Sequence, residues 1–209
     1  MKTILLFILI ILTASQNALA WGERGHDLVT RVAVQNLRAL SSDNPKLVRP
    51  FTVRDHMLSH LSNVPDIVWR APYQSELVLE INPSTHYINL EKVYDNVELY
   101  SDIPSDFLEY AKDARAKGYE PNESGTAPWR VMQLYASLVD AMKQAGMAKH
   151  RKEIEKQGNQ VLLMAGLMSH FVGDLANPHH TTANHNGQLT GQGGFHSYFE
   201  SQTVEEQGF

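Results

Sequence analysis

Two pairs of a histidine and a carboxylate, four residues apart, stand in the last third of the sequence. His170 and Asp174 form the first pair, in SHFVGDLANPHH, and His196 and Glu200 form the second, in GFHSYFE. Residues four apart share one face of a helix, so each pair presents an imidazole beside a carboxylate. Imidazole nitrogen and carboxylate oxygen are ligands that zinc takes in proteins. Together the pairs indicate a metal site, although a buried His–Asp hydrogen bond or a solvent-facing helix would each explain one pair alone.

The first pair is predicted to point into the protein interior. Leu163 and Leu167 continue its helical face toward the N-terminus, so the pair projects from an apolar stripe. A buried ionisable pair must be compensated, either by an internal hydrogen bond or by a shared metal. Pro178 then breaks the helix and lets His180 return toward the same point, with His179 as the alternative ligand there.

The composition favours a metal over a disulfide as a cross-link. The chain of 209 residues has 10 histidines and no cysteine. Exported proteins are often stabilised by disulfides, and a structural metal is the natural replacement where none can form. The formal net charge of −5 does not suggest a surface for polyanions. The sequence also has no G-x-S-x-G, P-loop or cysteine nucleophile that would support another hydrolytic mechanism.

Residues 1–20 are predicted to be a secretory signal peptide. They combine the positive charge of Lys2, an apolar run over residues 4–12 and the A-x-A pattern of residues 18–20. The run is too short for a membrane-spanning helix, which needs about 20 apolar residues. We therefore expect cleavage before Trp21, a secreted or periplasmic protein, and a change in formal charge from −5 to −6 as Lys2 is lost.

Hydrophobic periodicity and the placement of proline and glycine predict one mainly α-helical domain over residues 21–209. The predicted helices are 26–40, 105–117, 128–146, 148–175 and 196–206. Residues 71–103 and 119–127 are predicted to be loops, with short extended segments at 77–81 and 86–90, and glycines mark another loop at 187–194. Residues 46–65 are ambiguous, and the sequence shows no internal repeat.

The sequence resembles the zinc-dependent phospholipase C family, which shares its metal site with the fungal single-strand-specific nucleases. The resemblance rests on WGERGH at 21–26, HFVGDLANPHH at 170–180 and GFHSYFE at 194–200. It extends over nearly all of residues 21–209, although it is anchored at only a few places. It implies a phospholipase C or zinc nuclease-like fold, mainly α-helical, around three zinc ions.

The resemblance also implies a set of metal ligands. These are Trp21, His26, Asp66, His86, His170, Asp174, His180, His196 and Glu200. One zinc is expected on Asp66, His86, His170 and a bridging Asp174, a second on Trp21, His26 and Asp174, and a third on His180, His196 and Glu200. Asp66 is also the expected general base. His60 and Asp55 remain alternatives to Asp66 and His86, because only short sequence motifs support Asp66 and His86.

Trp21 is expected to bind metal through its α-amino group and its carbonyl oxygen. A free α-amino group has a pKa near 7.7–8.0, low enough for a metal to displace its proton. That group exists at Trp21 only after the signal peptide is removed. The resemblance therefore implies that the active protein forms only after export.

Different motifs favour different phosphodiester substrates. The W-x4-H spacing of Trp21 and His26 is similar to the nuclease branch, whereas Glu200 and the short connection from His180 to His196 are similar to the phospholipases. The C-terminal motif is the stronger evidence, because both its sequence and its spacing are similar to the phospholipases. We expect a phospholipase C that cleaves phospholipid at a membrane surface to diacylglycerol and a phosphorylated head group.

Single-stranded nucleic acid is the alternative substrate. Tyr87, Trp69 and Tyr198 could stack on its bases, although each could instead belong to the core or the rim. The aromatic residues that would hold a choline head group are not visible, since Ile67 follows Asp66 directly and position 83 is a proline. No protein partner is indicated.

The resemblance also implies that the fold is C-terminally truncated. The chain ends at Phe209, shortly after Glu200, where the family usually continues with further helices. A third alternative is therefore a zinc-binding relative without activity.

Overall fold

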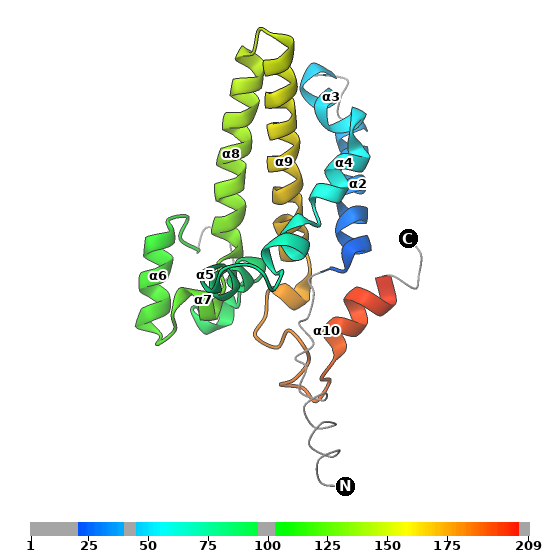
Figure 1. Ribbon diagram of the computed structural model, residues 1–209. Coiled ribbons are helices and arrows are strands. Elements are labelled where there is room, and N and C mark those ends of the chain that lie inside the picture. Colours follow the sequence, from blue (N-terminus) through cyan, green and yellow to red (C-terminus); the bar gives the residue numbers. More distant parts are fainter. Residues whose placement is uncertain (1–20, 40–44, 96–102, 205–209) are drawn as a thin grey trace.

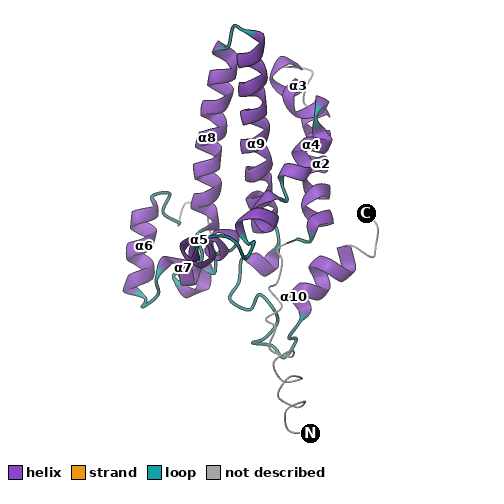
Figure 2. Cartoon of the chain, in the orientation of Figure 1, coloured by secondary structure: helices purple, strands orange, loops and turns teal. Residues whose placement is uncertain are grey.

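The computed structural model of the chain describes residues 21–39, 45–95 and 103–204, which contain helices, turns and loops and no strand (Figure 2). The α-helices are α2 (Glu23–Ala39), α3 (Pro45–Val53), α4 (Asp55–Leu61), α5 (Glu76–Ile81), α6 (Phe107–Ala116), α7 (Pro121–Ser124), α8 (Ala127–Met147), α9 (Arg151–Leu175) and α10 (Phe195–Ser197). The 3-10 and π-helical segments are η2 (Pro65–Trp69), η3 (Asn82–His86), η4 (Leu90–Lys92), η6 (Pro178–His180) and η7 (Tyr198–Thr203). The mainly α-helical fold class is confirmed.

The longest unit of the fold is an antiparallel pair formed by α8 and α9 (Figure 1). Leu138 and Ala141 of α8 belong to the same buried core as Val161, Leu162 and Ala165 of α9. These residues recur at helical spacing, so each helix buries one face. Packing against α8 fixes the position of α9. The C-terminal end of α9 carries the first histidine–carboxylate pair.

Three shorter helices join this core. Val34 of α2, Phe51 of α3 and Leu58 of α4 all pack into it. Helix α4 comes so close to α9 at Gly166 that a Cβ atom there would lie 2.4 Å from Leu61 Cβ. A side chain at position 166 would therefore push α4 away. Because η2 follows α4 in the chain, this close approach also positions η2 beside α9.

A second core holds the segment that contains η3 and η4. Tyr110 of α6 stacks on Trp129 of α8 with 3.9 Å between ring centroids, and its hydroxyl donates to the Gly125 carbonyl at 2.9 Å. Ile88 packs into this core. The Ile88 amide donates to the His180 carbonyl at 2.8 Å, which fastens the segment to the chain that follows α9.

The long predicted helices are confirmed. The predictions at 26–40, 105–117, 128–146 and 148–175 correspond to α2, α6, α8 and α9, with ends that differ by about one turn or less. Asp106 caps α6 by accepting from the Leu108 amide, and Pro128 lies in the first turn of α8. The helical prediction at 196–206 corresponds to α10 and η7. Leu40 and the predicted signal peptide, residues 1–20, lie outside the described residues.

The two predicted extended segments are wrong. Residues 77–81 form α5, because Ser75 accepts a hydrogen bond from the Val78 amide and so begins a helix. Around 86–90 the backbone does not pair as a strand: the amides of Ile88 and Asn89 donate to carbonyls of two different segments. The loop prediction at 119–127 missed the single turn of α7, which Glu120 caps.

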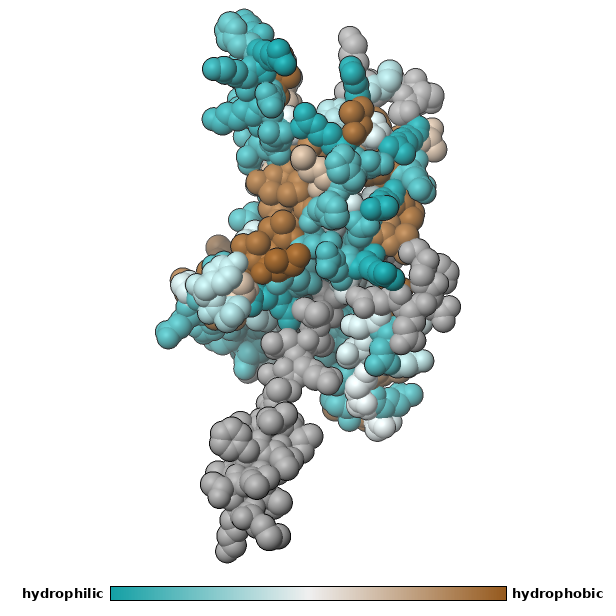
Figure 3. All heavy atoms as spheres, turned by 45° about the vertical axis from the view of Figure 1, so that its right-hand side comes forward, coloured by the Kyte–Doolittle hydropathy of each residue, from teal (hydrophilic) through white to brown (hydrophobic). Residues whose placement is uncertain are grey.

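The surface differs along the length of the molecule. Hydrophilic side chains cover the end where α8 meets α9, while apolar side chains reach the surface at mid-height (Figure 3). Tyr73, Leu77 and Ile81, in and beside α5, are 76%, 63% and 46% exposed. Within the described residues, no helix is both long enough and apolar enough to span a bilayer.

Candidate metal centre

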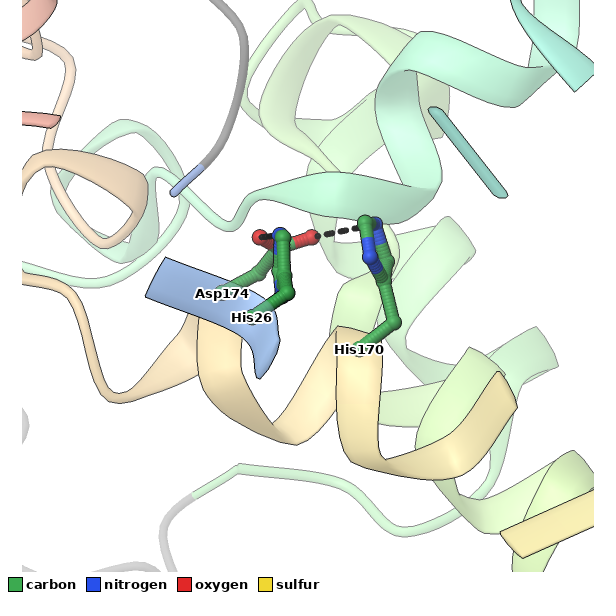
Figure 4. A group of neighbouring side chains, drawn as sticks. All are labelled: His26, His170 and Asp174. Carbon is green, nitrogen blue, oxygen red and sulfur yellow. Dashed lines mark ion pairs between the residues drawn. The ribbon is translucent and has the colours of Figure 1, made fainter. Parts of the chain in front are cut away.

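The end of α9 brings His170 and Asp174 together with His26 of α2. All three side chains are buried. The Asp174 carboxylate reaches both rings (Figure 4): Oδ1 lies 3.4 Å from His26 Nε2 and Oδ2 lies 3.3 Å from His170 Nε2. The two imidazoles stack with 3.9 Å between their centroids. The Asp174 carboxylate thus lies beside two imidazole rings that come from different helices.

The N-terminal word WGERGH positions His26. The Trp21 indole Nε1 donates to the Gly173 carbonyl at 2.8 Å and so ties the start of α2 to α9. A Cβ at Gly25 would lie 2.8 Å from Trp21 Cβ, so this position requires glycine. The indole therefore has a defined structural role, while the α-amino group of Trp21 as a ligand stays a prediction.

Asp66 and His86 complete what we call the Asp174 group: His26, Asp66, His86, His170 and Asp174. His86 Nδ1 lies 2.9 Å from Asp174 Oδ2 and 3.0 Å from His170 Nε2. Asp66 approaches from η2, with Oδ2 3.9 Å from His26 Nε2 and Oδ1 4.0 Å from His170 Nε2. The wide turn of η2 is π-helical, a geometry that is frequent at functional sites.

His180, His196 and Glu200 form a second group, which we call the Glu200 group. Glu200 Oε1 lies 3.1 Å from His180 Nε2 and 2.6 Å from His196 Nε2. Glu200 also stands on a π-helical segment, η7. His180 Nδ1 lies 3.9 Å from Asp174 Oδ1, so the two groups adjoin.

Outer contacts orient the imidazoles. His170 Nδ1 lies 2.7 Å from the Ser62 carbonyl and His180 Nδ1 lies 2.6 Å from the His86 carbonyl. Because a carbonyl only accepts, each Nδ1 carries the hydrogen and each Nε2 is left for a ligand role. The Asn177 amide donates to Glu200 Oε1.

Several buried polar atoms in the centre have no hydrogen-bond partner among the residues that the structure describes. They include both ring nitrogens of His26, Oδ1 of Asp174 and Oε2 of Glu200. Buried polar atoms are normally satisfied, and a bound cation would satisfy the acceptors among these, which are the two carboxylate oxygens and one nitrogen of His26. The candidate ligand sets that lie within 4.8 Å are His26, His170 and Asp174; Asp66, His86 and His170; and His180, His196 and Glu200. The residues therefore fit bound metal ions by position and by chemistry.

Burial sets the charge state of the Asp174 group in the metal-free chain. It lowers the pKa of His26 to about 3 and lowers the pKa of His86 and His170 well below the ordinary value, so these imidazoles are neutral. Burial, together with the negative charges of Asp66 and Glu200, raises the pKa of Asp174 well above its ordinary value. A neutral imidazole and an ionised carboxylate are the forms that bind metal.

Glu200 behaves differently from Asp174. Burial raises the pKa of Glu200, but its hydrogen bonds and electrostatic interactions with His180 and His196 outweigh that effect. The pKa of Glu200 is lowered as a result, and its carboxylate is prepared to accept a cation.

A cavity of about 430 Å³ opens beside both groups. Arg70, Tyr87 and Lys92 line it together with ligand candidates from each group, among them His86 and His196. Arg70 Nη1 lies 3.1 Å from Asp66 Oδ1, so a residue that lines the cavity is paired with a carboxylate of the Asp174 group. The centre is thus accessible to a small polar group.

The alternative ligands do not join either group. His60 is exposed, and Asp55 forms an ion pair with Arg38 at 2.8 Å on the surface. His179 lines the cavity and stacks on the His196 ring with 5.4 Å between centroids, while His180 takes the place in the Glu200 group.

Sequence reasoning missed three residues that support the centre. Arg70 stands four residues after Asp66, a spacing that could have signalled the ion pair. Asn177 lies inside the quoted word NPHH but was given no role. Ser62 contributes only its carbonyl, which no side-chain pattern reveals.

Comparison with protein-family models, curated proteins and solved structures finds no match to this chain.

Proposed function

We propose that this protein is an exported zinc-dependent phosphodiester hydrolase with a phospholipase C or nuclease-like fold. The proposed reaction is cleavage of a phospholipid to diacylglycerol and a phosphorylated head group. Its zinc ions would be held by the Asp174 group, the Glu200 group and the terminal residue Trp21. Export and cleavage before Trp21 are part of the proposal.

One observation carries the proposal: ligand sets converge around Asp174 beside a cavity that a charged side chain lines. His26, His170 and Asp174 form one set, and Asp66 and His86 form another with the same His170. His170 offers only Nε2, but Asp174 can bridge two ions, because its Oδ1 lies 3.4 Å from His26 Nε2 and its Oδ2 lies 2.9 Å from His86 Nδ1. Neighbouring metal ions are typical of enzymes that displace an oxygen at phosphorus.

The residues of the chain have separate tasks in this reaction. Bound zinc would lower the pKa of water and polarise a phosphoryl oxygen. Asp66, whose side chain is 12% exposed, would take a proton from the attacking water at a carboxylate oxygen. Burial raises its pKa, which makes the carboxylate a stronger base. Arg70 lines the cavity and would bind the negative phosphate.

Phospholipid is favoured over nucleic acid by Glu200 and by the short connection between His180 and His196. A single-strand-specific nuclease is the second candidate, favoured by the spacing of Trp21 and His26. Of the three aromatic residues that could stack on bases, Tyr87 lines the cavity, Tyr198 is 55% exposed and Trp69 packs on Phe171. Only Tyr87 is therefore suitably placed to stack on a base at the centre.

A paired assay tests the proposal. Purified chain that begins at Trp21 is loaded with zinc and given a water-soluble short-chain phospholipid in one reaction and single-stranded DNA in the other. We expect diacylglycerol from the first reaction and loss of that activity in a chelator. Rapid DNA cleavage with inert phospholipid would select the nuclease.

Zinc content measured on the same sample separates the third candidate. Bound zinc without either activity would indicate a zinc-binding relative that is not an enzyme. A folded sample that binds no zinc would overturn all three candidates.

A further inference from the structure

A second cavity lies between α3 and α9, far from the metal centre. It has a volume of about 590 Å³, and its walls come from residues 49–54 on one side and from residues 151–162 on the other. Figure 1 shows α3 beside the start of α9, at the end of the molecule away from α10. Ile154 lines the cavity 16 residues before His170, which is about 24 Å along the helix axis. We call this cavity the α3–α9 groove.

Three arginines line the α3–α9 groove. Arg49 and Arg151 are exposed, and Arg54 is half-buried. None of the three forms an ion pair with another described residue, and the neighbouring carboxylate of Asp55 is already paired with Arg38 at 2.8 Å. Three arginines and one glutamate give the lining a formal charge of +2, in a chain whose total is −5. The groove would therefore attract an anionic ligand.

A neutral side chain holds Arg54 in the groove. Arg54 Nη1 donates to Asn159 Oδ1 at 2.7 Å, which fixes the guanidinium against α9 without neutralising its charge. Because the side chain is already ordered, less conformational entropy is lost when an anion binds. The remaining N–H groups of a guanidinium can bind a carboxylate through two parallel hydrogen bonds.

Apolar residues line the groove beside the arginines. A Cβ atom at Gly158 would meet no described side chain within 4 Å, so this glycine leaves the groove open. Leu162, one helical turn further along α9, is buried, whereas Val53 and Ile154 are 63% and 52% exposed. Exposed apolar side chains beside cations suit a ligand that is apolar as well as anionic.

The spacing of the charges favours an extended ligand over a small anion. Arg151 is the first residue of α9, and Asn159, which holds Arg54, lies eight residues later, about 12 Å along the axis. An extended peptide rises about 3.3 Å per residue and points alternate side chains to one side, so carboxylates four residues apart lie about 13 Å apart on the same side. Such a peptide matches the spacing better than a single anionic head group.

Two features favour a peptide over a nucleic acid. Glu155 stands on α9 between Arg151 and Asn159, where it would repel phosphates but could accept a hydrogen bond from a peptide N–H. Among the described residues that line the groove none is aromatic, so nucleic-acid bases would find no stacking surface.

We propose that the α3–α9 groove binds an acidic peptide segment of a partner protein, with apolar side chains between its carboxylates. The arginines bind the carboxylates, while Val53 and Ile154 pack against the apolar side chains. This interaction surface is separate from the metal centre, so the inference does not rest on the proposed hydrolase function.

Fluorescence anisotropy with a labelled peptide tests the groove. The zinc-loaded chain that begins at Trp21 is titrated into the peptide Glu-Val-Glu-Leu-Glu, with both ends blocked. We expect saturable binding that weakens as salt is added. Arg151→Glu should raise the Kd about 10-fold or more, because a charge-assisted contact is replaced by repulsion. Gly158→Leu should also weaken binding, without any change of charge, because the added side chain fills the groove.

Lys112→Glu is the matched control. Lys112 is exposed on α6 and does not line the groove, and the variant makes the same change of charge as Arg151→Glu. Its Kd should equal that of the unaltered chain. A peptide with lysine in place of each glutamate should not bind, and Glu-Ser-Glu-Ser-Glu should bind more weakly than the apolar peptide. Circular dichroism and zinc content should be unchanged in every variant.

Other outcomes would overturn the proposal. Equal losses in Lys112→Glu and Arg151→Glu would show that net charge alone attracts the peptide. Binding of a single-stranded oligonucleotide in the groove, without binding of the peptide, would assign the groove to nucleic acid. If the peptide does not bind and Arg151→Glu instead dissociates a dimer in sedimentation, a second copy of the chain covers the groove.

Discussion

The Asp174 group and the Glu200 group use the same kinds of side chain but differ in what stabilises them without a cation. In the Asp174 group, neither ring nitrogen of His26 has a hydrogen-bond partner among the described residues, although Nε2 lies 3.4 Å from Asp174 Oδ1, and ring nitrogens of His86 and His170 lie 3.0 Å apart. In the Glu200 group, one carboxylate oxygen accepts from Asn177 and lies within 3.1 Å of both imidazoles, while Oε2 of Glu200 and Nδ1 of His196 have no hydrogen-bond partner among the described residues.

The difference follows from where the residues come from. The Asp174 group is drawn from α2, η2, η3 and α9, which are distant in the sequence, whereas the Glu200 group comes from the short stretch of η6, α10 and η7. Burial raises the pKa of Asp174, while hydrogen bonds outweigh burial and lower the pKa of Glu200. We infer that the Asp174 group depends on metal for its stability and that the Glu200 group depends on it less.

Removal of each central carboxylate should have unequal effects. Asp174→Asn removes the carboxylate that contacts three imidazoles, so we expect loss of zinc from the whole Asp174 group and a fall in kcat of roughly 10³-fold. Glu200→Gln should lose zinc from the Glu200 group alone. Metal analysis and kinetics on both variants measure this, and identical zinc contents would contradict the comparison.

Metal removal should destabilise the protein mainly through the Asp174 group. At a free zinc concentration 1,000 times the Kd, chelation is expected to lower the free energy of unfolding by about 4 kcal/mol per strong site. Urea denaturation with and without chelator would measure the loss. Glu200→Gln should retain most of this sensitivity, and Asp174→Asn should retain little; the opposite ranking would sink the comparison.

Acidification of the metal-free protein should expose the contribution of His26. Its pKa is about 3 in the folded chain against an ordinary value of 6.5. The unfolded chain therefore binds the proton first, so the stability contributed by His26 is complete above pH 6.5 and is lost as the pH falls toward 3. His26→Phe removes the group that binds this proton but keeps an aromatic ring beside His170. Thermal unfolding between pH 7 and 4 should show a shallower decline in the variant, and parallel curves would show that His26 is not buried neutral.

The smallest effect is expected at Trp21. Trp21→Phe removes the hydrogen bond to the Gly173 carbonyl and should lower the free energy of unfolding by about 1 kcal/mol, with zinc content unchanged. One alanine added before Trp21 should instead lower the zinc content of the Asp174 group, because it displaces the proposed α-amino ligand. Urea denaturation and metal analysis distinguish the two roles. Full zinc content in the extended chain would remove Trp21 from the ligand set.

The helices could be predicted because their signals are local. Pro128 and the apolar periodicity mark α8, and the spacing of His170 and Asp174 follows from α9 alone. Residues 77–81 were misassigned because their apolar side chains have no buried partner, so a single cap at Ser75 decides the conformation. A propensity argument that assumes burial fails for such a segment.

The candidate site could be predicted only in part, for the same physical reason. Spacing on one helix pairs His196 with Glu200, but the meeting of Asp66 with His86 depends on how η2 and η3 pack against α9. That packing is tertiary and leaves no periodic trace. The resemblance to a known family supplied Asp66 and His86, whereas Arg70 belongs to the contacts that only three-dimensional placement reveals.

The two π-helical segments have a consequence for how this site could be lost. Asp66 stands on η2 and Glu200 on η7, and a wide turn is what one extra residue leaves in an otherwise regular helix. Deleting one residue from either segment would restore ordinary winding and rotate the carboxylate by about 100° around the helix axis. Substitutions elsewhere on these segments preserve that angle. The centre should therefore tolerate exchange of neighbouring side chains far better than a change of one in chain length.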